Sequence, residues 1–161
     1  MIAGFEWPVA ASDFHKKLFS NVEEYGWHLV GIYAEEDYPE FVFSVGLYYH
    51  YTHPEVLVMG LPSNTAAGLI NAVGEMVRNG VVIEKGRPYT GVADDCPVAF
   101  VPIDKRHYHQ HLGIAVWFYS SLPDDFPALQ LVWPDKAGLF PWQLGYDEEY
   151  GSQQRLLHAT S

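Results

Sequence analysis

Residues 41–48 of the chain read FVFSVGLY, and this stretch decides the fold class. Apolar side chains at the odd positions, such as Phe41 and Phe43, alternate with a second set at the even positions, which includes Ser44. A repeat of two residues is typical of a β-strand whose two faces differ. We therefore expect a strand over residues 41–48 and a loop over residues 49–54.

Further strands are expected on both sides of this one. Residues 27–33 read as a strand, and Asp37-Tyr38-Pro39 reads as the turn that follows it. Residues 55–61 are almost continuously apolar, which is typical of a buried strand. The other expected strands are residues 81–83, 97–103 and 128–132, with a weaker one at residues 87–90.

Three segments show helical spacing instead. Ser12 is expected to cap the first helix, and the other two are expected to begin at Ser63 or Asn64 and after Asp104. Because the strands come mostly in adjacent groups separated by only three helices, the sequence predicts an α+β fold with a mostly antiparallel sheet. A barrel-like sheet remains an alternative. The length suits one domain over residues 1–161 with a short polar tail at residues 147–161.

Composition excludes several classes of function. Acidic residues outnumber basic ones by 20 to 9, which gives a net charge of −11, and no basic cluster is larger than Lys105-Arg106. Such a chain repels phosphate backbones, so we expect no nucleic-acid partner. No apolar run of about 18 residues indicates a membrane span, and the first residues lack the pattern of a secretory signal.

Cysteine and glycine patterns also limit the chemistry. Cys96 is the only cysteine, so neither an intrachain disulfide nor a cysteine-based zinc cage is possible. This usage is typical of a reducing compartment, and we expect the cytoplasm. The glycines form neither a phosphate loop nor a dinucleotide fingerprint, so no cofactor is expected.

The densest group of histidines is His107-Tyr108-His109-Gln110-His111. In a helix, His107 and His111 would lie on one face and would be candidate metal ligands, with His53 or Asp104 as a third. A helix whose first turns merely carry polar residues explains the segment better, since no glutamate ligand accompanies it. We therefore assign no metal site.

A second group is His53-Pro54-Glu55. Proline holds His53 in an extended conformation, and a histidine beside a carboxylate can accept and orient a proton, so both are candidate catalytic residues. The favoured alternative is structural, with His53 bonded to a backbone carbonyl and Glu55 capping a neighbouring loop. His28, next to Trp27, is a further candidate for a pocket.

The most distinctive segment is QLVWPDKAGLFPW, residues 130–142. Its two prolines stiffen the chain, and Asp135 can bond backbone amides within a turn. The segment is expected to be either a rigid clasp or, through Trp133 and Trp142, the aromatic wall of a pocket. The clasp is favoured.

With these motifs the chain resembles the bacterial domain-of-unknown-function family numbered 4262 over about residues 20–146. The segments that carry the resemblance are YGWH (25–28), FSVGL (43–47), HPEVLVMGL (53–61), LGIA (112–115) and residues 130–142. Ser44 departs from an expected threonine, and His109 and His111 stand where the family carries acidic or aromatic residues. The resemblance implies kinship without an activity, and it draws attention to His53, Glu55 and the segment from Trp133 to Trp142.

Three functions remain, in this order. The first is a non-catalytic domain that binds a small molecule in an aromatic and histidine-lined pocket. The second is an interaction or inhibitor protein whose acidic surface meets a protein partner. The third is a hydrolase that uses His53 and Glu55, with or without a metal. The candidate ligand-binding residues are His28, Ser44, Tyr48, His53, Trp133, Asp135 and Trp142.

Overall fold

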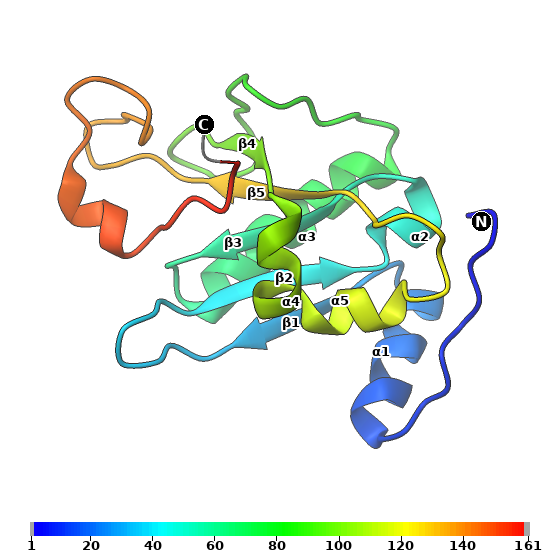
Figure 1. Cartoon of the computed structure of the whole chain (residues 1–161). Helices are drawn as coiled ribbons and strands as arrows, with labels where there is room; N and C mark the ends of the chain where they lie inside the picture. Colours follow the sequence, from blue (N-terminus) through cyan, green and yellow to red (C-terminus); the bar gives the residue numbers. More distant parts are fainter. Residues whose placement is uncertain (1, 160–161) are drawn as a thin grey trace.

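The computed structural model describes residues 2–159 (Figure 1). Its strands are β1 (His28–Ile32), β2 (Phe41–Val45), β3 (Glu55–Met59), β4 (Ala99–Pro102) and β5 (Ala128–Val132). Its α-helices are α1 (Asp13–Glu24), α2 (Leu47–Tyr51), α3 (Ser63–Arg78), α4 (Tyr108–His111) and α5 (Gly113–Phe118). Two short 3-10 helices, η1 (Lys105–His107) and η2 (Glu148–Ser152), complete the described elements.

The strands form one sheet in the order β1-β2-β3-β5-β4. Three neighbouring pairs are antiparallel, and β3 and β5 pair in parallel. The expected α+β fold with a mostly antiparallel sheet is therefore confirmed. The sheet is open, with β1 and β4 at its two edges, so the barrel-like alternative is not formed.

Helices cover both faces of the sheet (Figure 1). On one face α3 packs through Ile70 and Val73 against Val56 and Val58 of β3. On the other face α1, α4 and α5 share a core with the odd-numbered residues of β2 and β3, such as Phe43. The alternation within the strands thus places one apolar layer on each side of the sheet.

The first helix forms as the sequence predicts. The Ser12 side chain accepts a hydrogen bond from the His15 backbone N–H, which is an N-cap contact. Leu18 and Val22, which are four residues apart, are buried beneath the helix.

The region after β2 differs from the expectation. The strand ends at Val45 instead of Tyr48, and α2 occupies part of the expected loop. Gly46 joins the two elements with a φ of 123°, a value that side chains rarely allow, and an added Cβ would lie 2.8 Å from the Gly26 carbonyl oxygen. This glycine turns the chain, so the apolar Leu47 joins the opposite core layer.

The expected third helix is divided. Asp104 does cap a helical turn, because its side chain accepts from the Arg106 N–H of η1. The chain then forms α4 and α5, separated at Leu112, whose φ and ψ of −119° and 31° are not helical. With α2, this division gives five α-helices in residues 2–159 instead of about three.

Two of the expected short strands are also wrong. Residues 81–83 form no strand, and residues 87–90 contribute only an isolated bridge between Tyr89 and Val98. The last element of this region, β4, begins at Ala99. Of residues 81–83 only Ile83 is buried, where side-chain packing holds it in the core, and Val81 and Val82 are exposed.

The C-terminal segment is fixed to β5 by two buried glutamines. Gln154 accepts from the Trp133 N–H and donates to the Trp133 carbonyl, both at 2.8 Å. Gln130 donates to the Arg155 carbonyl and accepts from the Leu157 N–H, also at 2.8 Å. These primary amides replace backbone pairing, so the segment packs closely without becoming a strand.

No helix in the described part of the chain combines the length and the apolar character needed to cross a membrane.

Candidate functional site

The sheet places the expected ligand residues at its two opposite ends. Strands β3 and β5 run in parallel, and their first residues, Glu55 and Ala128, lie side by side. The segment that follows β5 therefore begins at the opposite end of the sheet from Glu55. One end holds His28, Ser44, Tyr48 and His53. The other end holds Trp133, Asp135 and Trp142. The expected pocket that combines the tryptophans with His53 is therefore not formed.

Glu55 lies at the first of these ends and is fully buried. Its carboxylate accepts hydrogen bonds from five donors. These are Ser44 Oγ at 2.7 Å, the backbone N–H groups of Gly46 at 2.9 Å, Leu47 at 3.2 Å and Tyr48 at 3.2 Å, and the Tyr119 hydroxyl. The carboxylate thus caps the N-terminus of α2, where backbone N–H groups lack partners within the helix.

Glu55 and His53 have different surroundings. Burial raises the pKa of Glu55, although the hydrogen bonds from Tyr119 and Ser44 oppose this shift. His53 Nδ1 lies 2.9 Å from the Pro54 carbonyl oxygen, and its buried Nε2 has no hydrogen-bond partner among residues 2–159. No hydrogen bond joins His53 to Glu55 in this range. The two side chains therefore make separate contacts, His53 with the Pro54 carbonyl and Glu55 with the start of α2.

His107 and His111 do lie on one side of a helical turn, with ring centroids 5.6 Å apart. Both nitrogens of His111 are already engaged, Nδ1 with the His107 carbonyl at 3.1 Å and Nε2 with the Tyr38 hydroxyl at 2.5 Å. Residues 2–159 contain no group of three or more histidine, cysteine, aspartate or glutamate side chains placed to hold a metal. His111 thus joins α4 to the β1–β2 loop through Tyr38.

The segment after β5 is organised by Asp135. Its Oδ1 accepts from the N–H groups of Ala137 and Leu139, and Oδ2 accepts from the N–H of Asp147, all at 2.9 Å. These backbone donors, with Asp147 contributing most, hold the pKa of Asp135 below its ordinary value. Asp135 therefore closes the segment onto itself as a clasp.

The two tryptophans of this clasp have different surroundings. Trp133 is buried, and its indole N–H donates to the Met59 carbonyl at 2.8 Å. Trp142 is half exposed and stacks on Phe140 with ring centroids 5.2 Å apart. Trp133 holds the clasp to β3, while Trp142 lies at the surface.

A groove of about 320 Å³ lies beside His28, at the same end of the sheet as His53. We call it the His28 groove, and it lies where α1, β1 and α3 meet. The residues that line it are Asn21, Tyr25, Trp27, His28, Leu29 and Asn71.

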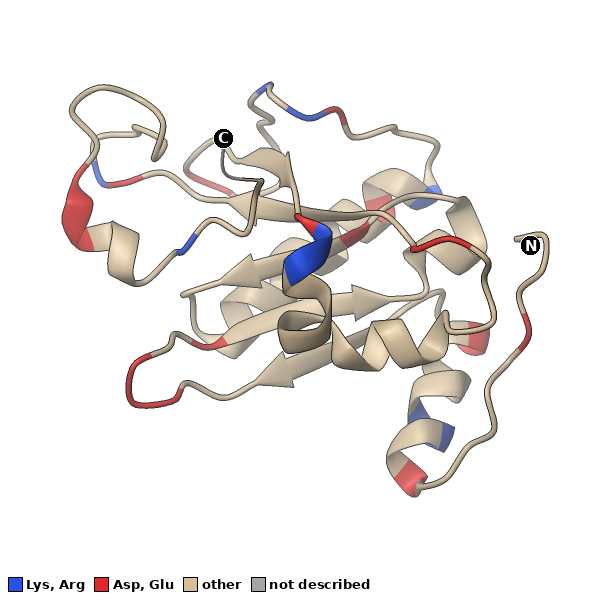
Figure 2. Cartoon of the chain, in the orientation of Figure 1, with Lys and Arg blue, Asp and Glu red and all other residues tan. Residues whose placement is uncertain are grey.

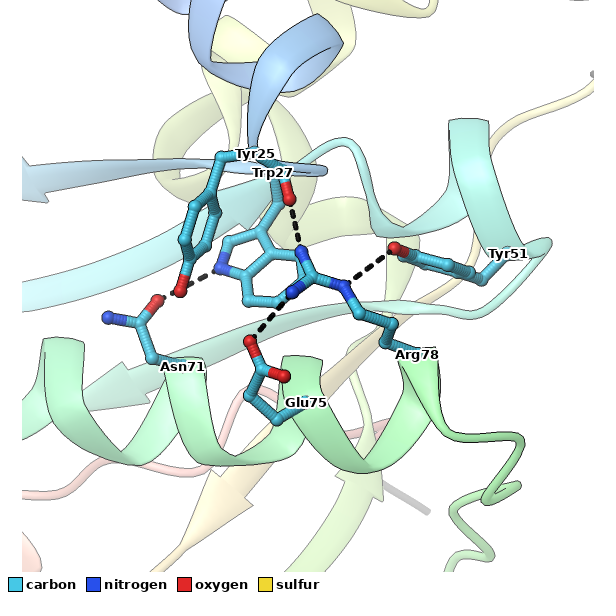
Figure 3. A network of polar contacts seen from close by, with 6 residues as sticks. All are labelled: Tyr25, Trp27, Tyr51, Asn71, Glu75 and Arg78. Carbon is cyan, nitrogen blue, oxygen red and sulfur yellow. Dashed lines mark hydrogen bonds and ion pairs between the residues drawn. The ribbon is translucent and has the colours of Figure 1, made fainter.

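Hydrogen-bonding groups with free capacity line the His28 groove. Asn21 Nδ2 lies 2.8 Å from His28 Nδ1, and the Trp27 indole N–H donates to Asn71 Oδ1 at 2.9 Å. Four further polar atoms, Asn21 Oδ1, the Tyr25 hydroxyl, His28 Nε2 and Asn71 Nδ2, have no hydrogen-bond partner among the described residues. In Figure 3 the tips of Tyr25 and Asn71 converge beside the Trp27 indole.

Arg78 supports this aromatic group from the end of α3 (Figure 3). Its guanidinium carbon lies 4.7 Å from the Trp27 ring centroid and 5.2 Å from that of Tyr25. It also donates to the Tyr25 carbonyl, to the Tyr51 hydroxyl at 3.2 Å and to Glu75 at 2.9 Å. Arg78 does not line the groove, so it positions the aromatic rings from behind.

Gly74 allows the indole to approach α3. A Cβ at this position would lie 2.3 Å from the Trp27 ring, a separation that real Cβ atoms do not show. The groove therefore depends on a glycine in the middle of a helix, where glycine is otherwise unfavourable.

Several groove residues carry no signal in the sequence. Asn21 and Asn71 lie on different helices, 50 positions apart, and neither belongs to a motif. Tyr38, the partner of His111, has no sequence signal beyond the expected turn Asp37-Tyr38-Pro39. The YGWH segment was the available signal, because it places Tyr25, Trp27 and His28 together.

Comparison with protein families gives one match. The family model described as domain of unknown function (DUF4262) matches residues 21–147. No curated protein matches the chain, and no solved structure matches it. The matched range contains β1 to β5 and all six residues of the His28 groove. The chain therefore belongs to the family described as domain of unknown function (DUF4262).

Proposed function

We propose that the protein binds a small neutral polar molecule in the His28 groove. The observation that carries this proposal is the set of four polar atoms without protein partners in one groove of about 320 Å³. Ligand sites are typically concave and combine aromatic surface with a few convergent polar groups. No enzymatic step is part of the proposal.

The polarity of the groove indicates the class of ligand. Burial, and to a smaller extent Lys17, lowers the pKa of His28, so its ring is neutral at neutral pH. With Nδ1 accepting from Asn21, the ring proton lies on Nε2 and is available to a ligand. No carboxylate, ammonium or guanidinium group lines the groove. A neutral ring compound with hydroxyl or amide groups, such as a monosaccharide or a nucleoside, matches this inventory.

The proposal is tested by NMR on ¹⁵N-labelled protein with two probes, methyl glucoside and adenosine. The Trp27 indole N–H, which is bonded to Asn71, serves as the reporter. At least one probe is expected to shift this signal with saturation. Asn71→Ala removes the unpaired amide donor together with the acceptor of the Trp27 indole, and is expected to weaken binding at least tenfold.

Asn64→Ala is the matched control, because Asn64 lies on the same helix in an exposed position outside the groove. It is expected to leave the affinity unchanged. Equal losses in both variants, or saturable shifts confined to residues remote from β1 and α3, would contradict the proposed site. The absence of any shift with either probe would reject the proposed ligand class.

A second candidate function is protein interaction, and exposed apolar side chains favour it. Leu144 is fully exposed and Trp142 is half exposed, in a segment that continues into Asp147, Glu148 and Glu149. A basic partner with an apolar contact would fit this surface. Affinity capture from extracts of the natural host at low ionic strength tests it. Capture that is lost on Leu144→Ser or at high salt is expected, and failure to capture any partner would count against this role.

The lone Cys96 supports a reducing environment, and we propose the cytoplasm as the location. Fractionation of the natural host with an antibody to the protein is the direct measurement. Recovery in the culture medium would contradict it.

A further inference from the structure

A second cavity lies on the other side of the molecule's first hairpin, between the β1–β2 loop and α4. Its volume is about 150 Å³. We call it the Tyr38 cavity, and its wall includes Tyr33, Glu35, Tyr38, Phe41, Gln110 and His111. It shares no residue with the His28 groove, so a ligand in this cavity is independent of the proposed function.

The hydrogen bonds of His111 determine which atoms of the Tyr38 cavity can accept a hydrogen bond from a ligand. The His107 carbonyl can only accept, so His111 Nδ1 carries the proton. Burial lowers the pKa of His111, which keeps the ring neutral and leaves Nε2 as an acceptor. Tyr38 therefore donates its hydroxyl proton to Nε2, and the phenol oxygen retains its lone pairs for a ligand.

The other polar groups of the cavity are mostly acceptors. The Glu35 side chain has no hydrogen bond or ion pair among the described residues, and its backbone pairs with that of Tyr38 across the loop. Gln110 contributes an amide that also has no side-chain partner in this range. A ligand that donates hydrogen bonds is therefore favoured over one that only accepts them.

The charge around the cavity is negative. Glu35, Glu36, Asp37 and Glu40 lie within six consecutive residues, and Figure 2 shows the tip of the β1–β2 loop entirely in the colour of acidic residues. Arg155 is the nearby cation, with its guanidinium carbon 4.6 Å from the Tyr38 ring centroid and a hydrogen bond to the Asp37 carbonyl. It does not line the Tyr38 cavity.

Aromatic faces complete the site. Three aromatic residues, Tyr33, Tyr38 and Phe41, line the cavity, and aromatic faces attract organic cations. A cavity of about 150 Å³ accommodates a ring the size of benzene. We propose that the Tyr38 cavity binds a small primary organic ammonium ion, which donates to the Tyr38 oxygen and pairs with the Glu35 carboxylate.

Benzylamine is the probe for this site, and benzyl alcohol is its uncharged counterpart of nearly equal size. Titrations followed by NMR at neutral pH are expected to give saturable shifts at Tyr38 and His111 with benzylamine. Benzyl alcohol is expected to bind about tenfold more weakly, because it lacks the charge that Glu35 recognises.

Glu35→Gln is expected to weaken benzylamine binding about tenfold and to leave the affinity for benzyl alcohol unchanged. Glu36→Gln is the control, since it removes the same charge from the same loop at a residue that does not line the cavity. Both positions are exposed, so both variants are expected to fold. Equal affinities for the amine and the alcohol, equal losses in the two variants, or no binding of benzylamine would each overturn the proposal.

Discussion

Individual glycines decide where the large side chains of this protein lie. In α3, Gly74 supports the Trp27 ring directly, whereas the position of Gly68 in the same helix has no atom within 4 Å of an added Cβ. The two residues share a helical backbone and differ in their surroundings. Substitutions at Gly68 and Gly74 therefore distinguish the low helix propensity of glycine from the space that glycine leaves for a neighbouring side chain.

Gly74→Ala and Gly68→Ala are therefore expected to have opposite effects. Gly68→Ala is expected to raise the free energy of unfolding by about 0.5–1 kcal/mol, because alanine favours helix. Gly74→Ala is expected to lower it by about 1–3 kcal/mol, because the methyl group overlaps the indole. Urea denaturation measures both. A gain in stability of similar size in the two variants would show that Trp27 moves freely.

Contacts of single residues with other elements account for most of the structure that local sequence patterns do not predict. The alternation in FVFSVGLY correctly predicts β2, but it continues through Gly46 and therefore hides the turn into α2. The cap of that helix comes from Glu55, eight positions beyond its first residue, and from the Tyr119 hydroxyl at the end of α5, which accepts from the Tyr49 N–H. Local sequence patterns do not record such contacts.

At the scale of elements, segments with a strong local period are predicted correctly. Leu18 and Val22 recur at helical spacing behind the Ser12 cap, and α1 forms there. The helix after Asp104 is predicted correctly at its start, and its division at Leu112 coincides with Gly113, a helix-weakening residue that the sequence prediction does not use. Residues 81–83 lack a partner strand, which an apolar run cannot reveal.

The contact between β5 and the C-terminal segment depends on the two glutamines. Gln154 forms hydrogen bonds with both the N–H and the carbonyl of the buried Trp133, so its side-chain amide replaces the two bonds that a paired strand would make. Its neighbour Gln153 is exposed and its side chain has no hydrogen bond among the described residues. Gln153 is therefore a control position for a substitution of Gln154.

Gln154→Ala is expected to lower the free energy of unfolding by about 2–4 kcal/mol, because it leaves two buried backbone groups without partners. Gln153→Ala is expected to change it by no more than about 0.5 kcal/mol. Thermal and urea denaturation measure the difference, and amide exchange at Trp133 reports the local contact. A mild Gln154→Ala variant with a protected Trp133 amide would contradict this assignment.

The candidate sites are predictable only in part, for a geometric reason. Sequence motifs single out His28 and the histidines near α4, which mark the His28 groove and the Tyr38 cavity. The same motifs group His53 with Trp133, which the parallel pairing of β3 and β5 places at opposite ends of the sheet. Strand order is not deducible from the chain, and strand order determines which ends meet.

For the molecule as a whole, charge is the dominant surface property. Acidic residues exceed basic ones by eleven, and the ion pairs found in residues 2–159 join exposed or partly exposed side chains, which contribute little stability. Mutual repulsion of the acidic groups therefore opposes the folded state.

Salt is expected to stabilise the protein at pH 7. Raising sodium chloride from about 0.05 M to about 0.5 M shortens the Debye length and screens this repulsion. A gain of about 1 kcal/mol would raise Tm by roughly 2–4 °C for a chain of this length. Near the isoelectric point of about 4.9 the net charge vanishes and the same salt step is expected to have little effect. A Tm that is insensitive to salt at pH 7 would contradict the repulsion.

The single parallel pairing has a consequence for how the chain is made. The strands β1, β2 and β3 follow one another and pair as neighbours, so they can assemble early during synthesis. The second edge of β3 has to wait for β5, which begins at Ala128, more than sixty residues after β3 ends. Long-range pairing of this kind slows folding. The nascent protein therefore exposes one apolar strand edge to the ribosome exit and to chaperones until most of the chain has emerged.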